Sequence, residues 1–114
     1  MSLFKHEVET INGVTILFEA LEEHISLSEL LPDDTPEQLK DIEDDNVIFC
    51  AKVSAVVDGV EFASDYLGGC IYSEYEDFYT KYKSDYYADM VQTVLKEGRI
   101  KAIELRDKLN VLIG

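Results

Sequence analysis

Two histidines and two cysteines are the residues of this 114-residue chain best suited to acid–base, nucleophilic or metal chemistry. His6 lies in a predicted edge strand and His24 in an acidic segment, and neither belongs to a nucleophile or metalloprotease motif. Cys50 and Cys70 are too far apart for a Cys-x-x-Cys redox pair or a zinc-ligand pair, so we expect two reduced, buried thiols. The sequence also lacks a glycine-rich phosphate loop. We therefore expect a protein that is not an enzyme and that needs no cofactor.

Clustered aspartate and glutamate residues could bind a metal ion, because carboxylate oxygens are the ligands that calcium and magnesium prefer. The clusters are Asp33 with Asp34, and residues 41–45. An EF-hand loop requires a central glycine and a terminal glutamate at fixed spacing, and neither is present. Any divalent ion would bind weakly, and we expect no specific metal site.

The acidic residues are distributed unevenly along the chain. Residues 1–80 hold nineteen acidic side chains and three lysines, whereas residues 81–114 hold seven basic and five acidic ones. The segment 19–45 alone has eleven carboxylates and one lysine. With a net charge of −14, the protein would repel nucleic-acid phosphates and anionic lipids. The expected partner is therefore a basic protein, without direct binding to nucleic acid or to a membrane.

A tyrosine-rich stretch follows, with six of the seven tyrosines between Tyr72 and Tyr87. Tyr86 and Tyr87 are adjacent, so in a helix they point in different directions, and we treat both as candidate anchors for a partner. The complete set of expected partner-binding residues is Glu22, Glu23, Asp33, Asp34, Asp41, Glu43, Asp44, Asp45, Tyr86 and Tyr87.

These features suggest a non-catalytic acidic protein that binds and inhibits a basic, nucleic-acid-binding protein. In charge and size the chain is comparable to the DNA-mimicking inhibitors of phages and mobile elements and to immunity proteins. Two alternatives remain. The acidic surface could serve only solubility. The nearly neutral C-terminal helices, rich in Ile and Leu, could instead make the protein a self-associating structural or regulatory module that forms a homodimer.

Two hairpins should carry these residues. Asn12-Gly13 and Asp58-Gly59 favour the type I′ turns of two-residue hairpin loops, so we predict one hairpin over residues 5–21 and another over 47–66. The more polar first strand should form a sheet edge. In the second hairpin, Ala51, Val53 and Ala55 should face the core, with Lys52 opposite Asp65 and Val56 opposite Glu61.

Capping patterns predict the helices. Ser26 with Glu29 should begin a helical turn that ends at Pro32, and Thr35-Pro36-Glu37-Gln38 should begin an acidic helix over residues 36–44. Ser73-Glu74-Tyr75-Glu76 should begin a helical C-terminal third, whose apolar spacing includes Tyr82. Gly98 is expected to be a C-cap or hinge, and residues 108–113 could form either helix or a last strand.

The predicted fold is α+β. Two antiparallel β-hairpins form one sheet, a short acidic helix lies between them, and C-terminal helices pack on one sheet face. We expect a single domain over residues 1–114. The first residues lack the apolar run of a signal peptide or membrane span, so a cytoplasmic protein is expected.

Overall fold

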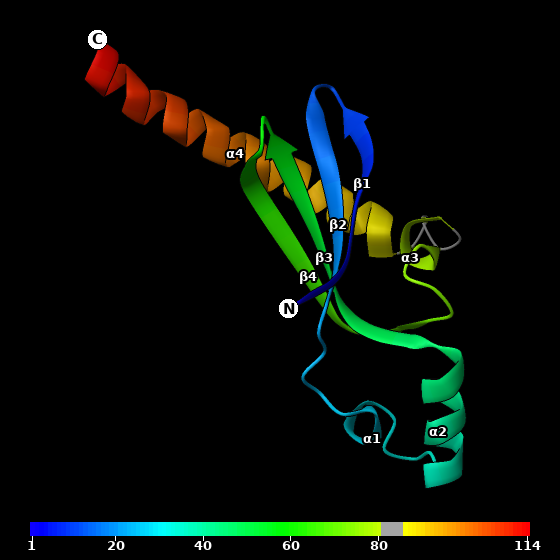
Figure 1. Cartoon of the computed structure of the whole chain (residues 1–114). Coiled ribbons are helices and arrows are strands. Elements are labelled where there is room, and N and C mark those ends of the chain that lie inside the picture. Colours follow the sequence, from blue (N-terminus) through cyan, green and yellow to red (C-terminus); the bar gives the residue numbers. More distant parts are fainter. Residues whose placement is uncertain (81–85) are drawn as a thin grey trace.

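The computed structural model describes residues 1–80 and 86–114. Four antiparallel strands form one sheet in the order β1-β2-β3-β4. Their bounds are β1 Ser2–Ile11, β2 Val14–Leu21, β3 Val47–Val57 and β4 Val60–Tyr72. A long C-terminal helix packs on one face of the sheet (Figure 1). The predicted α+β fold is confirmed, and β1 is an edge strand as its polar sequence indicates.

Both hairpin turns have the backbone geometry that their sequences favour. Asn12 and Gly13 have φ values of 50° and 83°, and Asp58 and Gly59 have 49° and 79°. Two successive positive φ angles are the mark of a type I′ turn, which matches the twist of the strands on either side.

The register of the second hairpin differs from the predicted one beyond its first two pairs. Val57 pairs with Val60 and Val56 with Glu61, as predicted, but Ala55 then pairs with Ala63. Phe62 is therefore an extra residue in a β-bulge, which shifts the pairs from Ala55 to Ala51 by one. As a result Lys52 lies opposite Tyr66 rather than Asp65.

A second irregularity occurs where we expected the strand to stop. Phe49 pairs with Cys70 and Ala51 with Leu67, so Gly68 and Gly69 together form a bulge on β4. Gly69 has a φ of 70°, which glycine adopts without strain. Because β4 continues through this bulge to Tyr72, the predicted end of the hairpin at residue 66 is wrong.

Two short helices lie between the hairpins: α1 Leu27–Leu30 and α2 Pro36–Asp45. The N–H of Gln38 donates to the Thr35 hydroxyl at 3.3 Å, and the Thr35 N–H donates to the Gln38 side chain at 2.8 Å. This capping box is the predicted one, and it begins α2 at the predicted residue.

The C-terminal third differs more from prediction. Residues 73–76 form bends and turns rather than the first turn of a helix, and α3 covers only Asp77–Thr80. The expected position of Tyr82 lies outside the described residues. Helix α4 then covers Ala88–Ile113, which shows that residues 108–113 are helical. Gly98 lies inside α4, so it is neither a C-cap nor a hinge.

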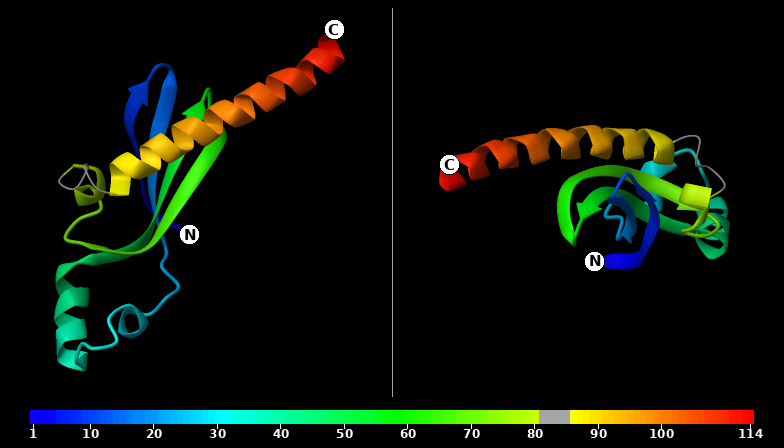
Figure 2. Two further views of the ribbon diagram at one scale, coloured as in Figure 1. Left: turned by 180° about the vertical axis from the view of Figure 1, so that it is seen from behind. Right: turned by 90° about the horizontal axis from the view of Figure 1, so that it is seen from above.

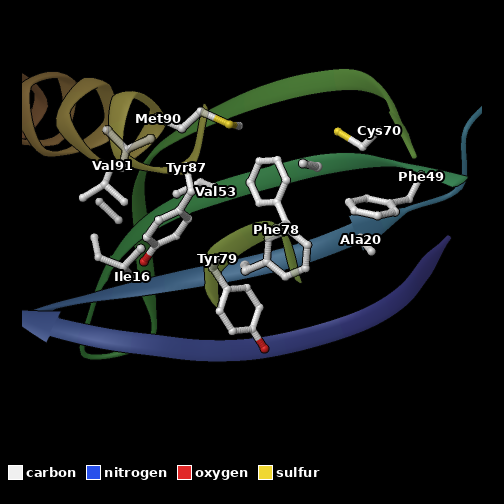
Figure 3. Close-up of a cluster of buried hydrophobic side chains, with 14 residues drawn as sticks. Ile16, Ala20, Phe49, Val53, Cys70, Phe78, Tyr79, Tyr87, Met90 and Val91 are labelled. Atoms are coloured by element: carbon white, nitrogen blue, oxygen red, sulfur yellow. The ribbon is translucent and has the colours of Figure 1, made fainter. Parts of the chain in front are cut away.

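The core lies between the sheet and the first half of α4, with α3 completing it. Ile16 and Phe18 from β2, Phe49 and Val53 from β3, and Phe78 from α3 are almost completely buried (Figure 3). A Cβ atom added at Gly98 would lie 3.6 Å from the Cβ atoms of both Ala55 and Phe62. The glycine thus lies where the helix backbone packs directly against β3 and β4.

The molecule is elongated, measuring 65 × 24 × 21 Å along its principal axes. Helices α1 and α2 extend beyond one end of the sheet, and the C-terminal half of α4 extends beyond the opposite end (Figure 2). Most of the residues that bear on function lie on these two projections.

Candidate functional site

Residues 22–45 form a projection that we call the acidic arm. It contains α1 and α2, and neither helix has a buried residue. All eight carboxylates that we expected to bind a partner lie on this arm. Six of them are exposed and two, Glu23 and Asp34, are half-buried. The structure therefore gathers the predicted charges on one element that stands away from the sheet.

Glu23 attaches the base of the arm to β4. Its Oε2 accepts a hydrogen bond from the N–H of Gly69 at 2.6 Å, and its Oε1 accepts one from Ile25 at 3.1 Å. The Gly69 bond is the main reason that the pKa of Glu23 is lowered. Leu30 of α1 also packs close to Gly69. Glu23 thus holds the arm in place, a role in addition to the expected partner contact.

The C-terminal turn of α2 breaks an ordinary rule of helix electrostatics. Glu43, Asp44 and Asp45 occupy this turn, and no basic residue does. The carbonyl end of a helix carries partial negative charge, so each anion there costs about 0.3–1 kcal/mol. Such a departure from local consistency is the kind found at functional sites.

The arm carboxylates are not neutralised by basic side chains of the described residues. In residues 1–80 and 86–114, none of them forms an ion pair with a lysine or arginine. The described ion pairs lie elsewhere: Lys52 with Glu61 at 2.9 Å and Arg106 with Asp107 at 3.6 Å. The negative charge of the arm is therefore available to a partner.

A cavity of about 530 Å³ opens at the base of the arm. It is lined by Asn46, which follows α2, by residues 67–73 of β4 and the turn after it, and by Tyr86. Tyr86 is 58% exposed, so its ring is accessible beside the charged arm. This predicted anchor thus shares a cavity with Asn46, the residue that follows the last predicted carboxylate of α2.

Tyr87 is placed differently. It is only 2% exposed and lies within the buried cluster (Figure 3), and its hydroxyl donates a hydrogen bond to Oε2 of Glu9. Burial and this bond raise its pKa. The two neighbouring tyrosines do point in different directions, but Tyr87 belongs to the core, and the expectation that its ring is an exposed anchor is wrong.

The histidines and cysteines considered for catalysis differ in their exposure. His6 and His24 are both exposed, and His6 stacks on Tyr79 with ring centroids 5.5 Å apart. Cys50 and Cys70 are free, but only Cys70 is buried, whereas Cys50 is half-buried, contrary to expectation. Burial raises the pKa of both thiols, that of Cys70 to about 11, which disfavours the nucleophilic thiolate form.

In the part of the chain that the structure describes, no three His, Cys, Asp or Glu side chains are grouped closely enough to hold a metal ion. None of the described helices combines the length and the apolar character that crossing a membrane requires.

Sequence reasoning did not identify the cavity at the arm base or the full length of exposed α4. The cavity joins three segments that are distant in sequence. The second feature had a signal in the sequence, because an apolar heptad spacing continues from Gly98 to Leu112.

Comparisons with models of known protein families, with curated proteins and with solved structures found no match to this chain.

Proposed function

We propose that this protein is a non-catalytic inhibitor whose acidic arm occupies the nucleic-acid-binding surface of a basic protein. The observation that carries the proposal is the uncompensated charge on α2. Glu43, Asp44 and Asp45 lie where the helix dipole disfavours them, and no cation of the described chain pairs with them.

The charge density of α2 supports mimicry of a nucleic acid. Ten residues make a helix about 15 Å long, and this one carries five acidic residues and Lys40. That is about one net negative charge per 4 Å, close to the spacing of about 3.4 Å along one DNA strand. A groove that binds phosphates would therefore receive α2 with comparable electrostatics.

Tyr86 and the cavity beside it supply a contact that charge alone does not. An arginine side chain from the partner fits such a site, because the aromatic face attracts the guanidinium while the nearby arm attracts its charge. Tyrosine is also a frequent energetic centre of protein interfaces. The arm would then attract the basic partner electrostatically, and the cavity would fix the position of the partner's arginine side chain.

The test uses affinity capture from a bacterial lysate at low and high salt, with two charge-reversed variants. In the α2-reversed variant, four carboxylates of α2 become lysine: Asp41, Glu43, Asp44 and Asp45. In the control-reversed variant, four exposed carboxylates away from the arm become lysine: Glu7, Glu97, Glu104 and Asp107.

We expect the wild type and the control-reversed variant to capture the same basic protein, with elution by salt or by competing DNA. The α2-reversed variant should lose it. The helix dipole favours lysine over a carboxylate in the last turn of α2, so these substitutions should not unfold the arm. Lost capture would therefore reflect the lost negative charge. Equal loss in both variants, or capture retained by the α2-reversed variant, would refute the proposal.

A further inference from the structure

The apolar seam of α4 continues past the sheet without a partner. Val91, Leu95 and Gly98 face the sheet, and the same three-and-four spacing continues through four more residues. These are Ala102, Leu105, Leu109 and Leu112, and every residue from 99 to 114 is exposed. Leu105 and Leu109 are 43% and 44% exposed and Leu112 is 84% exposed. Figure 2 shows this half of the helix projecting free of the sheet.

The charges beside this seam are all positive. The positions that flank it on the helix surface are Arg99, Lys101, Arg106 and Lys108, whereas the anions of this segment lie farther around the helix. Side chains at such flanking positions select the partner of a paired helix. Two copies of this seam would place cations beside cations, so the flanks favour an acidic partner helix instead.

A groove at the start of the projecting half of α4 is also apolar and flanked by positive charge. Its volume is about 820 Å³, and it lies between the tips of the hairpins and α4. Ile11, Val57 and Phe62 contribute apolar walls, and its charged residues are Lys96 and Arg99. Among the described residues, no carboxylate lines it, although acidic residues outnumber basic ones by 24 to 10 in the chain.

We infer that the acidic arm of a second copy docks on this seam and groove, so that molecules associate head to tail. The arm has the complementary features: α2 is acidic, and its apolar residues Leu39 and Ile42 are half-buried without belonging to the core. The arm and the projecting half of α4 lie at opposite ends of a 65 Å molecule, so they do not meet within one chain.

This association is heterologous, because one surface of a molecule contacts a different surface of the next. It goes beyond the proposed function, and the two compete: a copy docked on the arm would cover the charges that a basic partner needs. Self-association would then store the protein in a form from which the partner releases it.

The test is complementation between two variants, followed by light scattering at several protein concentrations and salt levels. One is the α2-reversed variant, which lacks the acidic arm surface. The other, the seam-blocked variant, carries Leu105→Glu and Leu109→Glu on exposed positions outside the core. Circular dichroism serves as the control that both variants remain folded.

Wild-type protein should increase in mass with concentration, and less so at high salt. Each variant alone should keep the mass of one chain, 13.0 kDa, but an equimolar mixture should form a dimer of twice that mass. In the mixture, the seam-blocked variant supplies an intact arm and the α2-reversed variant supplies an intact seam. A wild type that stays monomeric, or an α2-reversed variant that still self-associates, would overturn the inference.

The outcome is separable from that of the proposed function. The seam-blocked variant retains its arm, so it should capture the basic partner as well as the wild type does. If head-to-tail association fails while that capture persists, only this inference falls.

Discussion

The Glu23 carboxylate and the Gly69 amide, 46 residues apart in sequence, are joined by a hydrogen bond of 2.6 Å. This bond links the start of the acidic arm to the bulge of β4. Because α1 and α2 contribute no buried residue to the core, the bond is a principal attachment of the arm. A charged arm held in this way presents its carboxylates in a defined position, which lowers the entropy lost on binding.

Replacing Glu23 with alanine should loosen the arm without unfolding the sheet. We expect the amide of Gly69 to exchange with solvent much faster, and the free energy of unfolding to fall by about 1 kcal/mol. Hydrogen exchange and chemical denaturation measure these effects. Glu22→Ala is the matched control, since Glu22 is exposed. An unchanged Gly69 amide in Glu23→Ala would show that the bond does not hold the arm.

Tyr86 and Tyr87 allow a second comparison between neighbours. Tyr87→Phe removes the hydroxyl that donates to Glu9, so it should lower the free energy of unfolding by about 1–2 kcal/mol. Tyr86→Phe should change it by less than about 0.5 kcal/mol, because this side chain is on the surface. Urea denaturation midpoints test both. Similar midpoints for the two variants would contradict the assignment of Tyr87 to the core.

Gly98 should tolerate one added methyl group and no more. A Cβ there would make ordinary contacts of 3.6–3.8 Å with Ala55, Phe62 and Ala63. Gly98→Ala should therefore raise stability by about 0.5–1 kcal/mol, because alanine is the better helix former. Gly98→Leu should lower it by overpacking. Thermal denaturation distinguishes them, and a destabilised Gly98→Ala variant would mean that the helix lies closer to the sheet than the structure shows.

The Lys52–Glu61 ion pair predicts a pH-dependent contribution to stability. The hydrogen bond from Lys52 is the main cause of the lowered pKa of Glu61, so the folded state favours the charged carboxylate. Its contribution is present above the unfolded pKa of about 4.3 and is lost as the pH falls through the lower folded value.

Glu61→Gln should accordingly cost about 0.5–1 kcal/mol at pH 7, a modest amount because the side chain is 46% exposed. The difference from wild type should disappear in strong acid. Denaturation series at several pH values measure it, with the exposed Glu7→Gln as control. A difference independent of pH would show that the ion pair does not contribute.

Much of the fold could be predicted from local signals. Asn12-Gly13 and Asp58-Gly59 have backbone preferences that determine the two hairpin turns, and Thr35 with Gln38 determines where α2 begins. The bulge at Phe62 could not be predicted, because Phe62 and the next residue, Ala63, are both apolar and either could pair with Ala55. The role of Gly98 could not be predicted either, because a glycine in a helical pattern can mark a helix end or a close helix–sheet contact.

The candidate site, like the fold, could be predicted from the sequence only in part. Its carboxylates are neighbours in sequence, so their gathering on one element could be anticipated. The cavity could not, because Asn46, Gly69 and Tyr86 come from three separate segments. The choice between Tyr86 and Tyr87 depends on how α4 is rotated against the sheet, and only tertiary packing determines that rotation.

Hydrogen–deuterium exchange of the protein, free and bound to its captured basic partner, tests the central claim most directly. We predict that binding slows exchange in residues 22–46 and around Tyr86, and that this protection weakens as salt is raised. Protection confined to the open face of the sheet or to the projecting half of α4, with residues 22–46 unchanged, would contradict the assignment of the acidic arm as the binding surface.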